Sequence, residues 1–209
     1  MTLTVGQRAP SFRLPSAQGP EVGLDDYRGR SNVILLFAKG MACGFCRQKM
    51  SQLARGAPRF RELGTEIILV SPTPLERGRF YARNFQLPFP YLCDPDRRVH
   101  EAYGLGARAR SVAWKVGVAL SARRMPPPPE TEFGPAKPTL SELNHLFTDD
   151  DLGFFIIDKA GVIRYATAGQ QVSFEGTKPV GVYPIPSNDE IVRELERCQG
   201  VGEWTALPA

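Results

Sequence analysis

The residues most able to do chemistry in this chain are two cysteines three positions apart. Cys43 and Cys46 follow an apolar run in the segment VILLFAKGMACGFCRQKM, residues 33–50. At the start of a helix, unpaired backbone N–H groups and the helix dipole stabilise a thiolate and lower the pKa of a thiol. Lys39 and Arg47 stand nearby and would add positive charge. Thiols one helical turn apart also close a disulfide with little backbone movement, so the pair is predicted to be redox-active.

Other interpretations of the pair fit less well. A structural zinc site needs four ligands, and the chain has no second CxxC or CxxH motif. Four cysteines in 209 residues are no disulfide framework, and a permanent disulfide is uncommon in the cytosol. Cys93 is expected to be a small core residue at the end of a strand. Cys198 is either a remote resolving thiol or a spectator, and we favour the spectator. His100 and His145 are expected at the surface or with satisfied hydrogen bonds.

The pair needs a strand before it and a helix after it. Residues 33–37 form a continuous apolar run, which predicts a strand buried on both faces. A helix is predicted to follow, because apolar side chains then recur every three or four residues: Cys46, Met50, Leu53, Ala57 and Phe60. Pro58 lies inside this pattern and is expected to kink or break the helix near Gly56.

Further elements extend this arrangement into a mixed sheet. A second buried strand is expected at 66–70, and Thr73, Pro74 and Glu76 read as the cap, N1 and N3 positions of a helix that stops before Leu87. The remaining expectations are an N-terminal hairpin at 12–24, a strand at 90–93, a helix through Tyr103, a hairpin at 154–166 and a helix at 189–198. This order predicts an α/β fold with helices on both faces of the sheet.

The length of 209 residues suits a single domain, residues 1–209, with one insertion. The insertion, residues 106–151, is expected to hold a helix over 107–124 and then a proline-rich loop from Pro126 to Pro129. The net charge is +4, but basic residues are interspersed with acidic ones, so nucleic-acid binding is not predicted. No apolar run approaches the roughly 20 residues of a membrane span. The N-terminus lacks a secretion signal, which predicts a cytoplasmic protein.

Several segments together resemble the peroxiredoxin-like proteins of the alkyl hydroperoxide reductase/thiol-specific antioxidant family. They are the N-terminal pattern from Val5 to Gly29, the strand with CxxCR, and the stretches LVSPTPLE, LPFPYLCDPDRRVHEAYGL, FFIIDKAGVIRY and NDEIVREL. The resemblance covers most of the chain outside residues 106–151. It implies a thioredoxin-like (peroxiredoxin-type) fold, a thiol peroxidase that needs no metal or organic cofactor, and a homodimer.

The chain departs from the family pattern at the site itself. Family members carry Pro-x-x-x-Thr/Ser-x-x-Cys, and its last cysteine, which attacks the peroxide, corresponds to Cys46. Cys43 then takes the threonine position and Lys39 the proline position. The family's peroxide-polarising arginine would fall in Asp149–Leu152, which has none. An arginine of the insertion could replace it; the candidates are Arg108, Arg110, Arg123 and Arg124.

Thioredoxin-like dithiol reductases are equally similar at Cys-x-x-Cys-Arg, and in them the first cysteine, here Cys43, is the nucleophile. Their cis-proline before the hairpin strand is replaced here by Gly153 and Phe154.

The preferred hypothesis is a hydroperoxide-reducing enzyme in which Cys46 attacks and Cys43 resolves, with Lys39 and Arg47 supporting. A thioredoxin- or glutaredoxin-type dithiol protein would then restore the pair. The alternatives are a thiol-disulfide reductase with Cys43 as nucleophile and a redox-sensing, partner-binding module.

Overall fold

A mixed β-sheet forms the centre of the molecule in the computed structural model, which describes residues 3–108, 133, 139, 149–170, 172–175, 178–182 and 185–198. The central order is β5-β4-β3-β7, with β6 and β8 also paired to β7. β3 lies parallel to β4, β4 lies parallel to β5, and β7 runs antiparallel to β3 and β8. The strand bounds are β3 Asn32–Phe37, β4 Thr65–Ser71, β5 Tyr91–Cys93, β6 Ala107–Arg108, β7 Asp149–Ile157 and β8 Ile163–Gln170.

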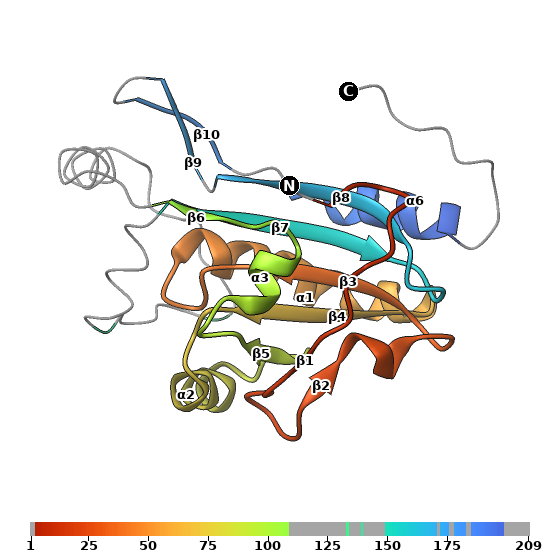
Figure 1. Cartoon of the computed structure of the whole chain (residues 1–209), viewed down its shortest axis with the longest axis horizontal. Coiled ribbons are helices and arrows are strands. Elements are labelled where there is room, and N and C mark those ends of the chain that lie inside the picture. The colour runs from red at the N-terminus through yellow and green to blue at the C-terminus, as the bar shows by residue number, and fades with distance from the viewer. Residues whose placement is uncertain are drawn as a thin grey trace.

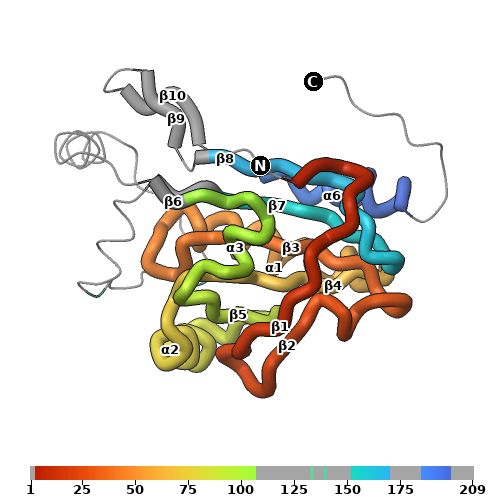
Figure 2. The backbone as a smooth tube through the Cα atoms, viewed as in Figure 1, coloured from red at the N-terminus to blue at the C-terminus, as the bar shows by residue number. Residues whose placement is uncertain are grey.

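Helices cover the sheet on both faces, as Figure 1 shows. Their bounds are α1 Gly44–Glu62, α2 Leu75–Phe85, α3 Arg98–Ala102 and α6 Asn188–Cys198. Successive side chains of β3 point to opposite faces. Ile34 and Leu36 pack with α1, α2 and α6 in one core cluster. Val33, Leu35 and Phe37 pack in a second cluster with α3 and the N-terminal segment, which crosses that face of the sheet (Figure 2).

The sequence predictions hold for most of these elements. The strand at 33–37 is β3, and all six of its residues are buried. The N-terminal hairpin forms from β1 (Arg13–Leu14) and β2 (Val22–Gly23), and the later hairpin forms from β7 and β8. The last helix, α6, begins after Ser187, whose hydroxyl accepts the Glu190 backbone N–H while the Glu190 carboxylate accepts the Ser187 backbone N–H. This reciprocal pair is a capping box.

Three local predictions failed in whole or in part. The predicted break of α1 near Gly56 is absent: the helix continues through Pro58 to Glu62, because Ala57 and Phe60 are buried in the core and hold the last turn in place. Pro74, not Thr73, is the N-cap of α2, and no side chain caps this helix. The predicted helix at 107–124 fails at its start, since Ala107 and Arg108 form β6 against β7. Residues 109–124 and the prolines at 126–129 lie outside the described residues.

Two further elements were not anticipated from the sequence. β9 (Val172–Glu175) and β10 (Lys178–Val182) form an antiparallel hairpin. Phe133, inside the insertion, is 8% exposed and belongs to the core cluster that contains both Cys43 and Cys46. Among the described residues, every helix is too short or too polar to cross a bilayer.

Candidate functional site

The cysteine pair lies where the central strand β3 ends and helix α1 begins. A loop from Ala38 to Cys43 joins the two elements, and Ala38 still donates a backbone hydrogen bond to the Val70 carbonyl of β4. Because β3, β4 and β5 are parallel, their carboxyl ends meet at this edge of the sheet. Sites in α/β proteins typically occupy that edge. The fold therefore places the predicted pair where the sequence analysis expects it.

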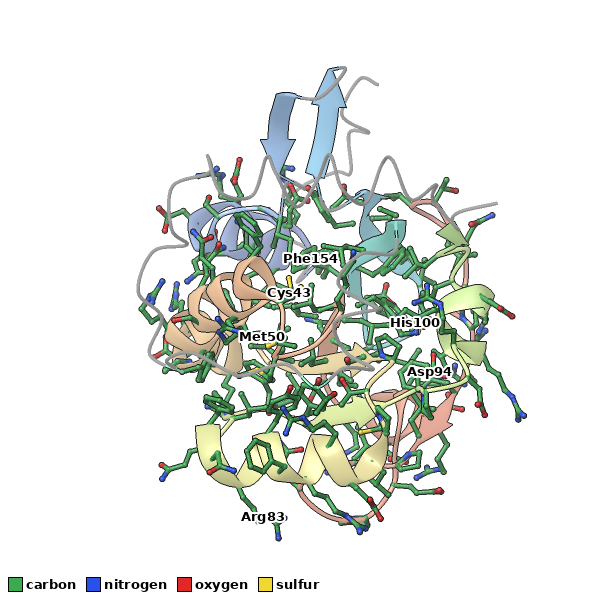
Figure 3. All side chains as sticks on the ribbon, turned by 90° about the vertical axis from the view of Figure 1, so that its left-hand side faces the viewer. Cys43, Met50, Arg83, Asp94, His100 and Phe154 are labelled. Carbon is green, nitrogen blue, oxygen red and sulfur yellow. The ribbon has the colours of Figure 1, made fainter. Side chains whose placement is uncertain are left out.

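Cys43 and Cys46 are brought together by the first turn of α1. Cys43 is the N-cap residue of the helix, and its Sγ accepts a hydrogen bond from the Cys46 backbone N–H, with 3.3 Å between N and Sγ. Both thiols are reduced, and the two residues are only 4% and 3% exposed. Figure 3 shows Cys43 in the interior at the start of α1. The site is thus a closed dithiol, with both sulfur atoms shielded from solvent.

The electrostatics of the pair differ from the sequence expectation at Cys46. Its pKa is raised well above the ordinary thiol value, first by the hydrogen bond between the two thiols and then by burial and the charge of Cys43. The lowered pKa that the helix N-terminus predicts is therefore wrong for Cys46 in this closed arrangement. The pKa of Cys46 is raised by its local surroundings, because the Cys46 backbone N–H already donates to Cys43 Sγ and the Cys46 thiol is desolvated.

Lys39 precedes the pair in the chain and Arg47 follows it, and the two residues make different contacts. The backbone N–H of Lys39 hydrogen-bonds the Cys46 sulfur, and this bond and the Lys39 charge both act to lower the pKa of Cys46. A proline at this position would have no N–H to donate. Arg47 instead holds the loop, since its Nη1 donates to the Met41 carbonyl. Its Nε–H is buried without a hydrogen-bond partner in the described part of the chain.

The other two cysteines are also free thiols. Cys93 ends β5 in the core, as predicted, and burial raises its pKa to about 11. Cys198 ends α6, which runs alongside α1: Asn188 hydrogen-bonds Gln52, and Glu196 pairs with Arg59 at 3.6 Å. Arg59 is 13 residues beyond Cys46, or roughly 20 Å along a helix. A disulfide needs Cα atoms within about 7 Å, so this geometry supports Cys198 as a spectator.

His100 is buried and satisfied, as the sequence analysis expects. Its Nδ1 lies 2.6 Å from Oδ2 of Asp94, and the same oxygen accepts the backbone N–H groups of Val99 and His100. Figure 3 shows this pair on the side of the molecule that carries α3. His145 and the arginines Arg110, Arg123 and Arg124 lie outside the described residues. Arg108 is described only through its backbone in β6.

Sequence analysis did not anticipate three hydroxyl groups beside the loop. Ser71 ends β4 and Thr73 follows it, at the edge where the cysteines lie, and the Tyr91 hydroxyl reaches both of them from the start of β5. Their oxygens are within 2.7–3.1 Å of one another. No sequence motif connects these residues, because they meet only through the parallel pairing of β4 with β5.

The described residues contain no group of three or more histidine, cysteine, aspartate or glutamate side chains arranged to hold a metal ion.

A mixed sheet with a Cys-x-x-Cys pair after its central strand defines a thioredoxin-like fold with a dithiol site. The chain belongs to the AhpC/TSA family, whose pattern matches residues 5–166. The match agrees with the resemblance on which the peroxiredoxin-type fold was predicted.

Individual relatives agree with this membership. Peroxiredoxin Bcp of Bacillus subtilis is 33% identical over 103 residues, which cover 49% of this chain and 65% of that protein. Alkyl hydroperoxide reductase E of Mycobacterium bovis is 25% identical over 170 residues, covering 80% and 87%. The thiol-disulfide oxidoreductase ResA of Geobacillus thermodenitrificans is 33% identical over 105 residues, covering 50% and 59%. The first relatives matched, from Mycobacterium tuberculosis, are covered over 64% of their length, which is less than two thirds.

Solved structures confirm the fold. A crystal structure of peroxidoxin BcpB from Mycobacterium tuberculosis superposes with a TM-score of 0.60 at 15% identity, covering 95% of this chain and 98% of that one. The reduced 2-Cys peroxiredoxin of Plasmodium vivax gives a TM-score of 0.60 at 14% identity, covering 94% and 96%.

Proposed function

We propose that this protein reduces hydroperoxides through the Cys43/Cys46 pair. The observation that carries the proposal is the AhpC/TSA match over residues 5–166, which spans the strand, the loop and the helix that hold the pair. Cys46 stands at the family's attacking position, and its sulfur receives the Lys39 backbone N–H. Under this proposal the Lys39 N–H and ammonium stand in for the family's threonine hydroxyl and arginine, which the sequence does not have at the corresponding positions.

In the proposed cycle the Cys46 thiolate attacks one peroxide oxygen and breaks the O–O bond. Cys46 becomes a sulfenic acid, and the other oxygen leaves as an alcohol, or as water when the oxidant is hydrogen peroxide, after taking up a proton. The Cys43 thiol then displaces water from the sulfenic acid and forms a Cys43–Cys46 disulfide. A reducing dithiol protein of the thioredoxin or glutaredoxin type supplies two electrons and two protons, which restore both thiols.

The proposed compartment, oligomeric state, cofactor requirement and partners are based on the family resemblance. We propose a cytoplasmic homodimer that acts on small hydroperoxides and uses no metal or organic cofactor. Neither nucleic acid nor membrane is a proposed partner, and residues 106–151 are proposed to be an insertion within a single domain. The shielding of both sulfur atoms favours a small oxidant over a large one, because Cys43 and Cys46 are both buried.

A thiol-disulfide reductase is the second candidate, and one specific observation favours it. Cys43 is the cap residue and accepts the Cys46 N–H, while Cys46 keeps its proton through the hydrogen bond to Cys43. Under this proposal Cys43 attacks a substrate disulfide and Cys46 resolves the mixed disulfide.

Rapid-quench mass spectrometry separates the two candidates. Reduced protein is mixed with one equivalent of hydrogen peroxide or an organic hydroperoxide, with Cys43→Ser and Cys46→Ser alongside and Cys198→Ser as the matched control. Trapped sulfenic acid on Cys46 in Cys43→Ser, formed much faster than on a free thiol, supports peroxide reduction. Peroxide reaction no faster than that of a free thiol, together with rapid reduction of a protein disulfide that Cys43→Ser abolishes, would establish the reductase instead.

A further inference from the structure

The three hydroxyls of Ser71, Thr73 and Tyr91 form a closed ring in the core. Ser71 Oγ lies 2.7 Å from Thr73 Oγ1, Thr73 Oγ1 lies 2.8 Å from the Tyr91 hydroxyl oxygen, and that hydroxyl donates to Ser71 Oγ at 3.1 Å. With Tyr91 donating to Ser71, Ser71 donates to Thr73 and Thr73 to Tyr91. Each hydroxyl then gives one hydrogen bond and receives one. The residues are 0%, 5% and 0% exposed, so this hydroxyl ring is buried, and its members satisfy one another's hydrogen bonds.

The hydroxyl ring lies directly against Gly40, in the loop that leads to the cysteines. A Cβ atom added to Gly40 would lie 2.7 Å from Thr73 Oγ1, and 2.9 Å from both Ser71 Oγ and the Tyr91 hydroxyl. Gly40 also has a φ of +109°, a conformation that side-chain-bearing residues rarely adopt. The loop backbone is therefore seated on all three oxygens at one point, and only glycine permits this approach.

The segment seated on the hydroxyl ring contacts both cysteines through its backbone. The Lys39 N–H hydrogen-bonds the Cys46 sulfur, and the Gly40 carbonyl accepts the Cys43 N–H at 3.2 Å. Any shift of Gly40 thus moves one partner of each cysteine. We propose that the Ser71–Thr73–Tyr91 hydroxyl ring is a positioning device for the redox loop, which sets the reactivity of Cys43 and Cys46 without touching the reacting atoms.

The hydroxyl ring is suited to holding the loop in one position. Three oxygens that each donate and accept a hydrogen bond fix one another's positions, since a fully satisfied buried polar network rigidifies the core around it. Tyr91 is itself held at both ends. Its backbone N–H donates to Gln18 Oε1, and its ring packs near Gly78 of α2, where an added Cβ would lie 3.7 Å from the ring. The hydroxyl ring therefore has a rigid base in β5 and α2.

The proposal rests on the proposed function only in requiring that the pair reacts as thiols, so its test uses alkylation as well as peroxide. Stopped-flow oxidation by hydrogen peroxide and iodoacetamide alkylation across pH 6–10 are measured for wild type, Tyr91→Phe, Thr73→Val and Thr73→Ser. Mass spectrometry assigns the modified cysteine. Tyr103→Phe is the matched control, because this buried tyrosine belongs to the other core cluster and donates its hydroxyl to the Pro10 carbonyl. Circular dichroism verifies that each variant is folded at the assay temperature.

Removal of one hydroxyl from the ring is expected to slow reaction of the pair about tenfold, as for one lost buried hydrogen bond, and to shift the pH midpoint of alkylation. Thr73→Ser, which keeps the hydroxyl, and Tyr103→Phe should both stay within about twofold of wild type. Folded Tyr91→Phe and Thr73→Val proteins that react like wild type would overturn the proposal, as would an equal loss in Tyr103→Phe. If peroxide oxidation is slow in every protein while the alkylation profiles still differ as expected, the proposed function fails and the positioning role stands.

Discussion

The sulfur of Cys43 accepts the backbone N–H of Cys46, so the first cysteine caps the helix on which the second one stands. The two thiols are therefore not equivalent in the reduced protein. Cys43 is bound as an acceptor, and Cys46 is the thiol whose pKa is raised. This difference between the two thiols cannot be read from the Cys-x-x-Cys spacing alone, and it leads to the first prediction.

Replacement of Cys43 by alanine should lower the pKa of Cys46. The substitution removes the largest cause of the upward shift, the hydrogen bond between the thiols, and also the charge of Cys43. Burial remains, while the Lys39 N–H and charge still act to lower the value. The pH dependence of Cys46 alkylation measures the change, with Cys198→Ala as the control. An unchanged midpoint would mean that burial alone holds the proton on Cys46.

Replacement of Asp94 by alanine should destabilise the fold by about 3–5 kcal/mol, since it removes a buried carboxylate that accepts several hydrogen bonds. Asp94 Oδ2 accepts three hydrogen bonds, from His100 Nδ1 and from the backbone N–H groups of Val99 and His100. Urea unfolding at pH 7 measures the loss. Asp96→Ala is the control, because the Asp96 side chain is 71% exposed and its ion pair with Arg98 is long, at 3.8 Å. Equal losses in both variants would contradict this account.

The same carboxylate predicts a pH dependence of stability. Burial acts to raise the pKa of Asp94, but the hydrogen bonds from His100 and Val99 outweigh it, and the pKa is lowered from its usual 3.8. A lowered folded-state pKa stabilises the protein above the unfolded-state value and loses that contribution as the pH falls below it. Wild type should therefore lose stability below about pH 4, and Asp94→Ala should show a shallower loss. Parallel curves for the two proteins would be inconsistent with this assignment.

Replacement of Gly56 by alanine should destabilise the protein although alanine is the better helix former. The preference for alanine is worth about 1 kcal/mol. The added Cβ, however, would lie 2.5 Å from the Phe60 ring and 2.8 Å from Asn188 Nδ2, and overpacking of this kind costs about 1–3 kcal/mol. We expect a net loss of about 1 kcal/mol in urea unfolding. Gly19→Ala, which meets nothing within 4 Å, should be neutral, and a stabilised Gly56→Ala would refute the packing argument.

Local sequence patterns were sufficient for the parts of the fold that local interactions decide. The continuous apolar run of residues 33–37 predicts a buried strand, and the three- and four-residue spacing from Cys46 to Phe60 predicts a helix. The structure has both. The position of the cysteine pair follows as well, because a strand and a helix joined by a short loop leave little choice. These features need no knowledge of distant residues.

Features that depend on tertiary contacts were not predictable in the same way. Thr73 has the right sequence context for a helix cap, but its hydroxyl bonds Ser71 and Tyr91, and Tyr91 is 18 residues away. Pro58 should break a helix, but Phe60 is fully buried and keeps the last turn in register. The pKa of Cys46 was misjudged for the same reason, because spacing reveals neither the acceptor of an N–H group nor the extent of burial.

The shielding of both sulfur atoms affects the order in which the oxidant and the protein reductant can reach the thiols. Under the proposed function, a molecule of a few atoms reaches the thiols with small local movements of the loop, whereas a second protein needs the first turn of α1 to unwind. That turn is capped by Cys43 itself, and a disulfide to Cys46 would remove the thiol's role as the cap. Oxidation would thus loosen the turn that a protein reductant must open. The small hydroperoxide would react with the closed site first, and the larger dithiol protein would gain access only after the disulfide has formed.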